Sequence, residues 1–216
     1  MGDPRDAQRT VAAVPRADPW PEGRALGAAV TYPTGSVLLR QGEPVDSVFL
    51  IEKGVIKLIR TEANGRELIA AFRSPGWLLG ATGVILSGPA ELTAQCACEC
   101  RLRPAGVDAF RRIHTSDPAV SAWVQRMLAR EVREHSTRVG QFLLKPAERL
   151  ARLLAALTPQ EHAGLGSGAR RMQFPIRQHE VADAIGVRRE TATRLLIEAE
   201  RKGLIERKGG WIMLTA

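Results

Sequence analysis

Short apolar runs separated by turn signals occupy the part of the chain between Tyr32 and Arg103. The runs recur every 8–12 residues, and glycine, proline or asparagine residues lie between them. The dipeptide Asn64-Gly65, placed between two such runs, is the strongest hairpin signal. Many short strands joined by regular turns are typical of an antiparallel barrel or sandwich. The pattern therefore predicts a β-domain in this region.

The hydrophobic period changes to that of a helix at Asp117-Pro118, where a capping carboxylate precedes a proline suited to the first helical turn. From here one stripe of residues recurs at steps of three and four: Val120, Val124, Leu128, Val132, His135, Val139 and Phe142. The stripe predicts a helix of about 25 residues, roughly 38 Å long, that ends at Lys145-Pro146. Because so long a helix extends beyond a small barrel, a second copy is expected to cover the stripe in a two-fold dimer. Packing of the stripe against its own domain is the alternative.

The remaining residues combine helical segments with a small hairpin. Residues 147–158 predict a helix, residues 164–168 a glycine- and serine-rich loop, and residues 174–176 a short edge strand. Two further helical segments follow, and the runs 204–206 and 211–214 flank a Gly-Gly turn. Helix, helix, helix and hairpin in this order predict a winged helix-turn-helix.

The segment 177–196 is the part with the clearest chemistry. Gly186 lies between two short amphipathic helices, where the chain has to turn sharply with a positive φ. One face of the second helix is apolar, and the other presents Arg188, Arg189, Glu190, Thr191 and Arg194. Arginine binds the O6/N7 edge of guanine, glutamate accepts a hydrogen bond from cytosine N4, and threonine can bind phosphate. The segment therefore predicts a helix that reads the DNA major groove. A surface ion pair between Glu190 and Arg194 is the alternative.

The charge balance agrees with a polyanionic partner. The 216 residues include 31 Lys and Arg against 23 Asp and Glu, a formal charge of +8 with a pI near 10.2. Residues 146–216 contain 12 basic and 8 acidic residues, a higher density of basic side chains than in the rest of the chain. Hydrophobic residues make up 44% and charged residues 25%, which excludes a disordered acidic tail, a collagen-like repeat and a disulfide mini-protein.

Several function classes lack their sequence signals. The chain has no run of about 18 apolar residues, so we expect no transmembrane helix and no membrane partner. The polar residues 1–6 lack the apolar core of a secretory signal, so we expect a cytoplasmic protein. A nucleophile elbow, a glycine-rich phosphate loop and a His-Glu-x-x-His helix are also absent, so we expect no enzyme activity.

Residues 28–216 resemble transcription regulators of the cyclic-AMP receptor protein/FNR family. The strongest match is residues 185–194, which contain the Arg-Glu-Thr-x-x-Arg pattern of the family's recognition helix. Glycine-containing segments that resemble the family's sensor domain are residues 35–38, 41–43, 49–54 and 75–80.

The resemblance implies an α+β fold with an N-terminal β-roll, a double-stranded β-helix like that of cyclic-nucleotide-binding domains. The implied order is a mobile arm (residues 1–27), the β-roll sensor domain (28–116), a dimerisation helix (117–145) and a winged helix-turn-helix DNA-binding domain (146–216). It also implies a homodimer that binds double-stranded DNA and regulates transcription, with RNA polymerase as a further expected partner.

The resemblance also implies roles for single residues. A TGTGA-like half-site of a palindrome would be read by Arg189, Glu190 and Arg194. Contacts to phosphate would come from Arg188, Thr191, His179, Gln178 and Lys208. Arg177 stands where the family usually has Ser or Thr, so the capping box with Glu180 would be incomplete.

The sensor domain departs from the cyclic-AMP binders of the family. Those proteins hold the ribose with the glutamate of a Gly-Glu pair and the phosphate with the arginine of an Arg-Ser pair. Here Gly80 is followed by Ala81-Thr82, and the Gly-Pro-Ala of residues 88–90 stands near the place of Arg-Ser. A cyclic phosphate buried without a cation costs on the order of several kcal/mol, so we expect an effector other than cyclic AMP. The candidate effector pocket comprises Gly80, Ala81, Thr82, His135 and Ser136.

The identity of the effector stays open. The N-terminal arm contains no cysteine, so an iron–sulfur cluster of the FNR type is not expected. A regulator of the same fold that works without any ligand is the alternative.

The three cysteines, Cys96, Cys98 and Cys100, are candidates for a different sensing chemistry. On a strand over residues 95–102 they would share one face, as buried core residues do. Thiolates are also good ligands for soft metals and metalloids and can act as redox groups, and a cysteine or His135 could bind haem. The residues leave core packing and a thiol-, metal- or haem-responsive sensor as alternatives.

Overall fold

The structure, a computed structural model, describes residues 18–24, 26–157, 170–171, 176–209 and 211–215. The chain forms two compact units: one extends to Gly140, and the other contains the residues from Gln141 onward. Each unit has its own β-structure and its own buried apolar residues.

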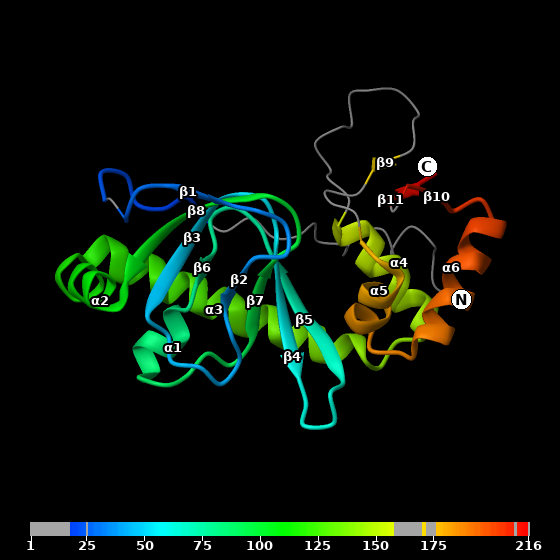
Figure 1. Ribbon diagram of the computed structural model, residues 1–216, viewed down its shortest axis with the longest axis horizontal. Helices are drawn as coiled ribbons and strands as arrows, with labels where there is room; N and C mark the ends of the chain where they lie inside the picture. The colour runs from blue at the N-terminus through cyan, green and yellow to red at the C-terminus, as the bar shows by residue number, and fades with distance from the viewer. Residues whose placement is uncertain (1–17, 25, 158–169, 172–175, 210, 216) are drawn as a thin grey trace. The chain divides into compact units, whose positions relative to one another are not determined.

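Two four-stranded antiparallel sheets form the framework of the first unit (Figure 1). In spatial order, one sheet consists of β1 (Val30–Tyr32), β8 (Cys100–Gly106), β3 (Ser47–Lys53) and β6 (Leu78–Leu79). The other consists of β2 (Val37–Leu39), β7 (Thr93–Cys96), β4 (Ile56–Thr61) and β5 (Glu67–Arg73). The helices of this unit are α1 (Ala81–Leu86), α2 (Val107–Ser116) and α3 (Pro118–Gln141). The predicted antiparallel β-domain is confirmed.

The predicted Asn64-Gly65 hairpin joins β4 to β5. Gly65 has φ +76°, a left-handed conformation that glycine adopts without the strain that a Cβ would cause. Asn64 Oδ1 accepts a hydrogen bond from Arg66 N (3.0 Å), and Glu62 N donates to Arg66 O (2.9 Å). The turn is therefore determined by local residues alone.

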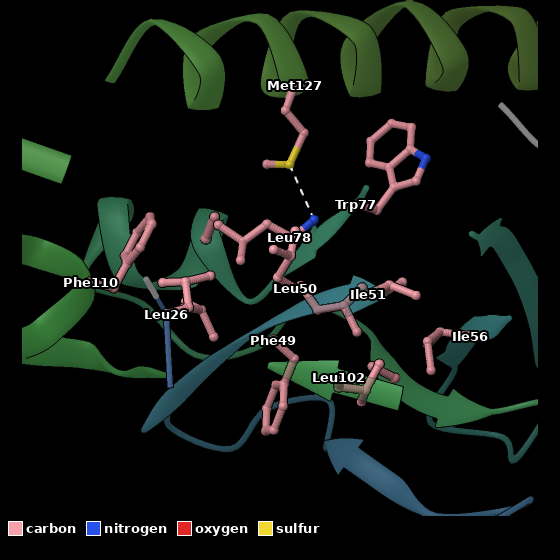
Figure 2. Packing of buried hydrophobic residues seen from close by; sticks show 14 of the residues in the cluster. Leu26, Phe49, Leu50, Ile51, Ile56, Trp77, Leu78, Leu102, Phe110 and Met127 are labelled. Carbon is pink, nitrogen blue, oxygen red and sulfur yellow. Dashed lines mark hydrogen bonds between the residues drawn. The ribbon is translucent and has the colours of Figure 1, made fainter. Parts of the chain in front are cut away.

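An apolar cluster joins the sheets of this unit to its helices (Figure 2). Its members include Ile51 and Leu102 from the first sheet, Phe110 from α2 and Met127 from α3. Met127 Sδ also accepts a hydrogen bond from Leu78 N at 3.4 Å. Burial of each such side chain contributes roughly 1.5–3 kcal/mol. The cluster therefore holds the first half of α3 against the sheets.

The long helix α3 begins where the sequence predicts it. Asp117 Oδ1 accepts hydrogen bonds from Ala119 N (2.8 Å) and Val120 N (3.3 Å), which is the geometry of an N-cap. Arg24 donates to the other carboxylate oxygen at 2.7 Å, and this bond lowers the pKa of Asp117. The helix ends at Gln141, slightly before the lysine-proline step that was expected to end it.

The two halves of α3 have different surroundings. The buried residues of the first half are Val120, Trp123, Val124 and Met127. In the second half, Val132 is 70% exposed and Val139 is 69% exposed. The stripe therefore packs on its own unit at one end, and its apolar side chains are uncovered in this chain at the other.

The described part of the predicted N-terminal arm starts at Asp18 and contacts α3. Trp20 packs edge-to-face on Trp123 of α3, with the ring centroids 4.9 Å apart. Trp123 Nε1 donates to Asp18 O at 3.0 Å, and Arg130 donates to Asp18 Oδ1 at 3.0 Å. The segment contacts α3 through the Trp20 ring, the Asp18 carboxylate and the Asp18 backbone carbonyl, and such contacts need no hydrophobic period in the sequence.

The single strand expected over residues 95–102 is not formed. β7 ends at Cys96 and β8 begins at Cys100, because the chain crosses from one sheet to the other between them. Cys96 and Cys100 are both buried, and Cys98 in the crossing is half-buried. The alternation of the sequence therefore predicted the burial of two cysteines correctly and their shared strand wrongly.

Gly54 lies directly against this crossing. It has φ +94°, and a Cβ at this position would lie 2.6 Å from Cys100 Sγ and 2.7 Å from Glu99 O. Gly54→Ala is expected to lower the free energy of unfolding by about 2–4 kcal/mol, because left-handed strain and overpacking act together. Urea titration followed by circular dichroism measures the loss. Gly65→Ala, at φ +76° with open space around it, is the control and should lose only about 1–2 kcal/mol. Equal losses would contradict the packing argument.

The second unit contains the remaining helices and a small sheet. The helices are α4 (Pro146–Leu157), α5 (Gln178–Ile185) and α6 (Arg189–Arg201). The antiparallel sheet has the spatial order β10 (Ile205–Lys208), β11 (Trp211–Leu214) and β9 (Arg170–Arg171). Three helices followed by a hairpin confirm the predicted winged helix-turn-helix. The predicted loop 164–168 lies outside the described residues, as do the first two residues of the predicted edge strand 174–176.

Candidate functional site

The turn between α5 and α6 requires glycine for two reasons. Gly186 ends α5 with φ +65°, and Val187 N donates to Ala182 O at 3.1 Å. A Cβ on Gly186 would also lie 2.8 Å from Cε1 of Phe142. The positive φ predicted from the sequence is confirmed, and the close aromatic contact is an additional constraint.

The first helix of the motif starts with one of the two hydrogen bonds of a capping box. Arg177 N donates to Glu180 Oε2 at 2.8 Å. The reciprocal bond needs an acceptor on the side chain of residue 177, and a guanidinium has none.

The second helix of the motif, α6, has one buried and one exposed face. Ala192 and Leu196 are buried. The exposed residues at its N-terminal half are Arg188, Arg189, Glu190 and Arg194, and Thr191 beside them is half-buried. A shallow depression on this face is lined by Arg189, Glu190, Thr193, Arg194 and Ile197. The structure thus brings the three predicted base-reading residues together on one surface.

Two residues of this depression were absent from the sequence-based set. Thr193 Oγ1 donates to Arg189 O at 2.9 Å and accepts a hydrogen bond from Gln178 Nε2 at 2.7 Å. This chain of bonds connects α5 to the first turn of α6. Ile197 is 52% exposed and lies three positions after Arg194. Helical spacing from Arg189 and Arg194 would have been sufficient to find both residues.

The wing strand β10 is tied to α6 by an ion pair. Arg207 donates to Glu200 Oε2 from Nε (2.9 Å) and from a terminal nitrogen (2.5 Å), and these bonds lower the pKa of Glu200. Lys208, the next residue, is exposed. His179, on α5, is half-buried. Of the two basic residues of the wing, Lys208 is therefore the one that stands free of this ion pair.

The first unit contains a cavity of about 450 Å³ lined by residues of the strands, α1 and α3. Among the predicted pocket residues, Gly80, Thr82 and His135 line it. Ala81 is buried and Ser136 is exposed, and neither lines the cavity. Part of the predicted set therefore meets at one cavity, with His135 contributed by the long helix.

A buried arginine at the end of β5 lines the same cavity and was missed from the sequence. Arg73 is 2% exposed, and its guanidinium donates to Glu131 Oε1 (3.0 Å) and Glu134 Oε2 (2.8 Å) of α3. It also lies over the ring of Trp77, 4.0 Å from the ring centroid. An arginine directly after an apolar strand, with two glutamates three positions apart on a helix, was the available signal.

Of the two glutamates that pair with Arg73, Glu134 is the one whose pKa is shifted by burial. Burial raises its pKa, and the charge and hydrogen bond of Arg73 oppose that shift. Its Oε1 atom is buried and has no hydrogen-bond partner among the described residues. The ionised form of Glu134 therefore depends mainly on Arg73, which is the largest source of compensation for its buried charge.

The cysteines form a hydrogen-bonded group at the crossing between the sheets. Cys100 Sγ donates to Val55 O (3.4 Å) and Cys98 O (3.2 Å). A thiol–thiol hydrogen bond with Cys96 raises the pKa of Cys100 to about 11, and a bond to Cys100 raises that of Cys98. The bond from Cys100 lowers the pKa of Cys96, whose side chain is buried.

This group has little of the character of a metal site. Within the described part of the chain, no three His, Cys, Asp or Glu side chains are arranged to hold a metal ion. Cys96 and Cys100 are buried members of the apolar cluster, which favours the core-packing interpretation of these two cysteines.

The sequence matches two known domain families, which together account for most of the chain. Residues 29–117 match the Cyclic nucleotide-binding domain, and residues 148–216 match the Crp-like helix-turn-helix domain. Over 187 residues, the chain is 27% identical to the CRP-like cAMP-activated global transcriptional regulator of Mycobacterium tuberculosis, covering 86% of this chain and 83% of that protein. Over 187 residues it is 28% identical to the cAMP-activated global transcriptional regulator CRP of Salmonella typhimurium, covering 85% and 87%. This chain belongs to the cyclic-AMP receptor protein (CRP)/FNR family.

Solved structures of CRP/FNR-family regulators share the fold. The c-di-GMP-responsive global regulator CLP of Xanthomonas campestris superimposes with a TM-score of 0.74 at 20% identity, covering 88% of this chain and 94% of that one. A CRP/FNR-family regulator of Thermus thermophilus superimposes with a TM-score of 0.72 at 23% identity, also covering 88% and 94%. The α+β architecture of β-roll, long helix and C-terminal helix-turn-helix is therefore confirmed.

Membership of the CRP/FNR family makes this protein a DNA-binding transcription regulator. Its relatives and its fold are those of regulators and not of enzymes. In the part of the chain that the structure describes, no helix is both long and apolar enough to cross a membrane.

Proposed function

We propose that this CRP/FNR-family protein is a homodimer that reads a palindromic DNA site with TGTGA-like half-sites and responds to an effector in its β-roll. The observation that carries the proposal is the grouping of Arg189, Glu190 and Arg194 in one exposed depression of α6. A recognition helix reads bases with the side chains of its N-terminal half. Arg189 is the first residue of α6, so all three side chains meet this requirement.

The polar side chains of the helix-turn-helix and its wing divide into base-reading and positioning groups. Arg189 and Arg194 are assigned to guanine edges, and Glu190 is assigned to cytosine N4. Ile197 adds apolar surface on the same face, which suits the methyl group of a thymine. Contacts to phosphate are assigned to Arg188, Thr191, His179, Lys208 and the second amide N–H of Gln178.

The dimer is supported by the uncovered half of α3. Val132 and Val139 are both about two-thirds exposed, and they lie seven residues apart on one face of the helix. A second copy related by a two-fold axis would cover this seam and present two recognition helices to half-sites one helical turn of DNA apart, roughly 34 Å. RNA polymerase is the expected protein partner of the DNA-bound dimer.

The effector is proposed to differ from the cyclic AMP named for the relatives. The position after Gly80 holds the buried Ala81, which offers no carboxylate to a ribose. The charged cavity residue next to the 88–90 loop is Glu91, an acid, and the buried Arg73 already holds two carboxylates. A regulator that works without a ligand is distinguished by DNA binding that no effector changes.

Arg189→Ala is expected to weaken binding to the preferred duplex by about 10- to 100-fold, or roughly 1–3 kcal/mol. The loss should come with relaxed preference at one guanine of each half-site, because the bidentate contact that reads this base is removed. Selection from a random duplex pool identifies the preferred site, and fluorescence anisotropy at fixed salt measures affinity.

Arg201→Ala is the matched control for this prediction, because Arg201 is also exposed on α6 but lies at its C-terminal end. It removes the same charge and should leave the base preference unchanged. Equal affinity of the wild-type protein for the selected and the scrambled duplex would contradict the proposed function.

A further inference from the structure

The cavity of the first unit has mostly apolar walls. Its lining includes Leu58 and Leu68 from the strands, Leu92 before β7, and Leu128 and Val132 from α3. Its volume of about 450 Å³ lies within the range of roughly 300–1,000 Å³ that small-molecule sites occupy. The space therefore suits a small organic molecule.

The charges around the cavity do not suit an anion. The buried arginine of the lining, Arg73, is held by Glu131 (3.0 Å) and a second acid. The other arginine, Arg60, is 48% exposed and pairs with the exposed Glu62 (3.2 Å). The other charged residues of the lining are acids, Glu91 and Glu131 itself. A phosphate inside this cavity would have to displace an acid from the buried Arg73 or lie near acids without a buried cation.

We propose that this cavity binds an uncharged, largely apolar small molecule, and that this is the chemical class of the effector. The proposal rests on the function proposed above, in which the β-roll is the controlled unit. The apolar body of the ligand lies against the leucines, where burial of apolar surface supplies the affinity. One hydrogen-bonding group of the ligand faces Glu131 or His135, the polar residues that α3 contributes to the wall.

The place of the ligand connects it to the dimer seam. Leu128 and Val132 line the cavity, and Val132 is also 70% exposed on the face of α3 assigned to the second copy. A ligand in contact with Val132 changes the surface that the partner helix meets. Such a difference in contacts between two arrangements is what an effector needs in order to shift their populations.

The test uses the full-length protein and N-phenyl-1-naphthylamine, an uncharged apolar molecule whose fluorescence rises in apolar sites. We expect saturable binding with one probe per protomer. Ala70→Phe, which places a ring in the cavity wall on β5, should weaken binding about tenfold or more. Ala109→Phe, on the exposed surface of α2, is the matched control and should bind the probe like the wild type.

Two results would overturn the proposal. Equal probe affinity in the wild type and Ala70→Phe would place the probe outside the cavity. Displacement of the probe by millimolar cyclic AMP, together with a rise in Tm, would show that the cavity accepts an anion. If circular dichroism shows that Ala70→Phe does not fold, Leu68→Trp on the same wall replaces it with the same expected loss.

DNA binding by the wild-type protein is measured in parallel, so that the two proposals can fail separately. If the probe results are as expected but the selected and scrambled duplexes bind equally, the proposed function is wrong and the ligand class stands. If the duplexes are distinguished but cyclic AMP displaces the probe, the ligand class and the exclusion of cyclic AMP as effector are wrong, and the proposed reading of DNA stands.

Discussion

Replacing Val132 and Val139 together by glutamate should leave the protein monomeric and lower its affinity for a palindromic duplex by about 100-fold or more. The two valines are 70% and 69% exposed, whereas the first half of α3 is buried in its own unit. A two-fold axis along this seam would bring four carboxylates together in the dimer. Like charges placed across an interface cost several kcal/mol, on the order of the whole gain from burying two valine pairs.

Sedimentation velocity measures the oligomeric state, and anisotropy with the selected duplex measures the affinity. Thr137→Glu is the control, because Thr137 is exposed on α3 but lies about 140° around the helix from Val132. It adds charge to the same helix and should leave the dimer intact. A double variant that remains dimeric and binds DNA like the wild type would disprove the assignment of this face.

Arg73→Met is expected to lower the free energy of unfolding by about 3–5 kcal/mol, the range found when one partner of a buried ion pair is removed. Arg73 is 2% exposed and neutralises Glu131 and Glu134, so its loss leaves two nearby carboxylates without their cation. Arg73→Met combined with Glu131→Gln and Glu134→Gln should recover much of the loss, because the uncompensated charges are then removed. Urea titration measures all of these variants.

The loss in Arg73→Met should also depend on pH. Burial already raises the pKa of Glu134, and Arg73 is the main group that opposes this shift. An acid whose pKa is raised in the folded state binds its proton more tightly there, so ionisation destabilises the fold above that pKa and the effect vanishes as the pH falls through it. The deficit of Arg73→Met should therefore be largest near about pH 8 and shrink toward about pH 5.

Arg101→Met is the control for both parts of this prediction. Arg101 pairs with Glu52 at 3.0 Å, but its side chain is 58% exposed. Exposed pairs contribute at most about 1 kcal/mol, so we expect a small loss. A loss as large as that of Arg73→Met would show that burial is not what makes the Arg73 group important.

Features that depend on neighbouring residues were predictable from the sequence. The Asn64-Gly65 turn, the Asp117 cap and the glycine turn at Gly186 all depend on backbone preferences or on hydrogen bonds over a few residues. The same holds for the exposed face of α6, because helical spacing places Arg189 and Arg194 on one side whatever the rest of the chain does.

Features that depend on contacts across the fold were not predictable in this way. From the sequence alone, Arg73 is interpreted as the polar end of a strand. Its ion pairs form because the fold places two glutamates of α3 beside it. Trp20 lies in a segment without any periodic pattern, and its role follows only from Trp123, far along the chain. The break between Cys96 and Cys100 arises because the chain changes sheets there, and alternation along one strand carries no information about a change of sheet.

By itself, the sequence determined the succession of β-domain, long helix and winged helix-turn-helix, and the side chains that α6 exposes. Periodicity, caps and turns determine these features, since each acts within one or two turns of chain. Only the tertiary structure decided the chemistry of the cavity: which residues line it, and that Arg73 is already neutralised by Glu131 and Glu134. A charge has no fixed chemical meaning until its partners and its burial are known, and residues distant in the sequence supply both.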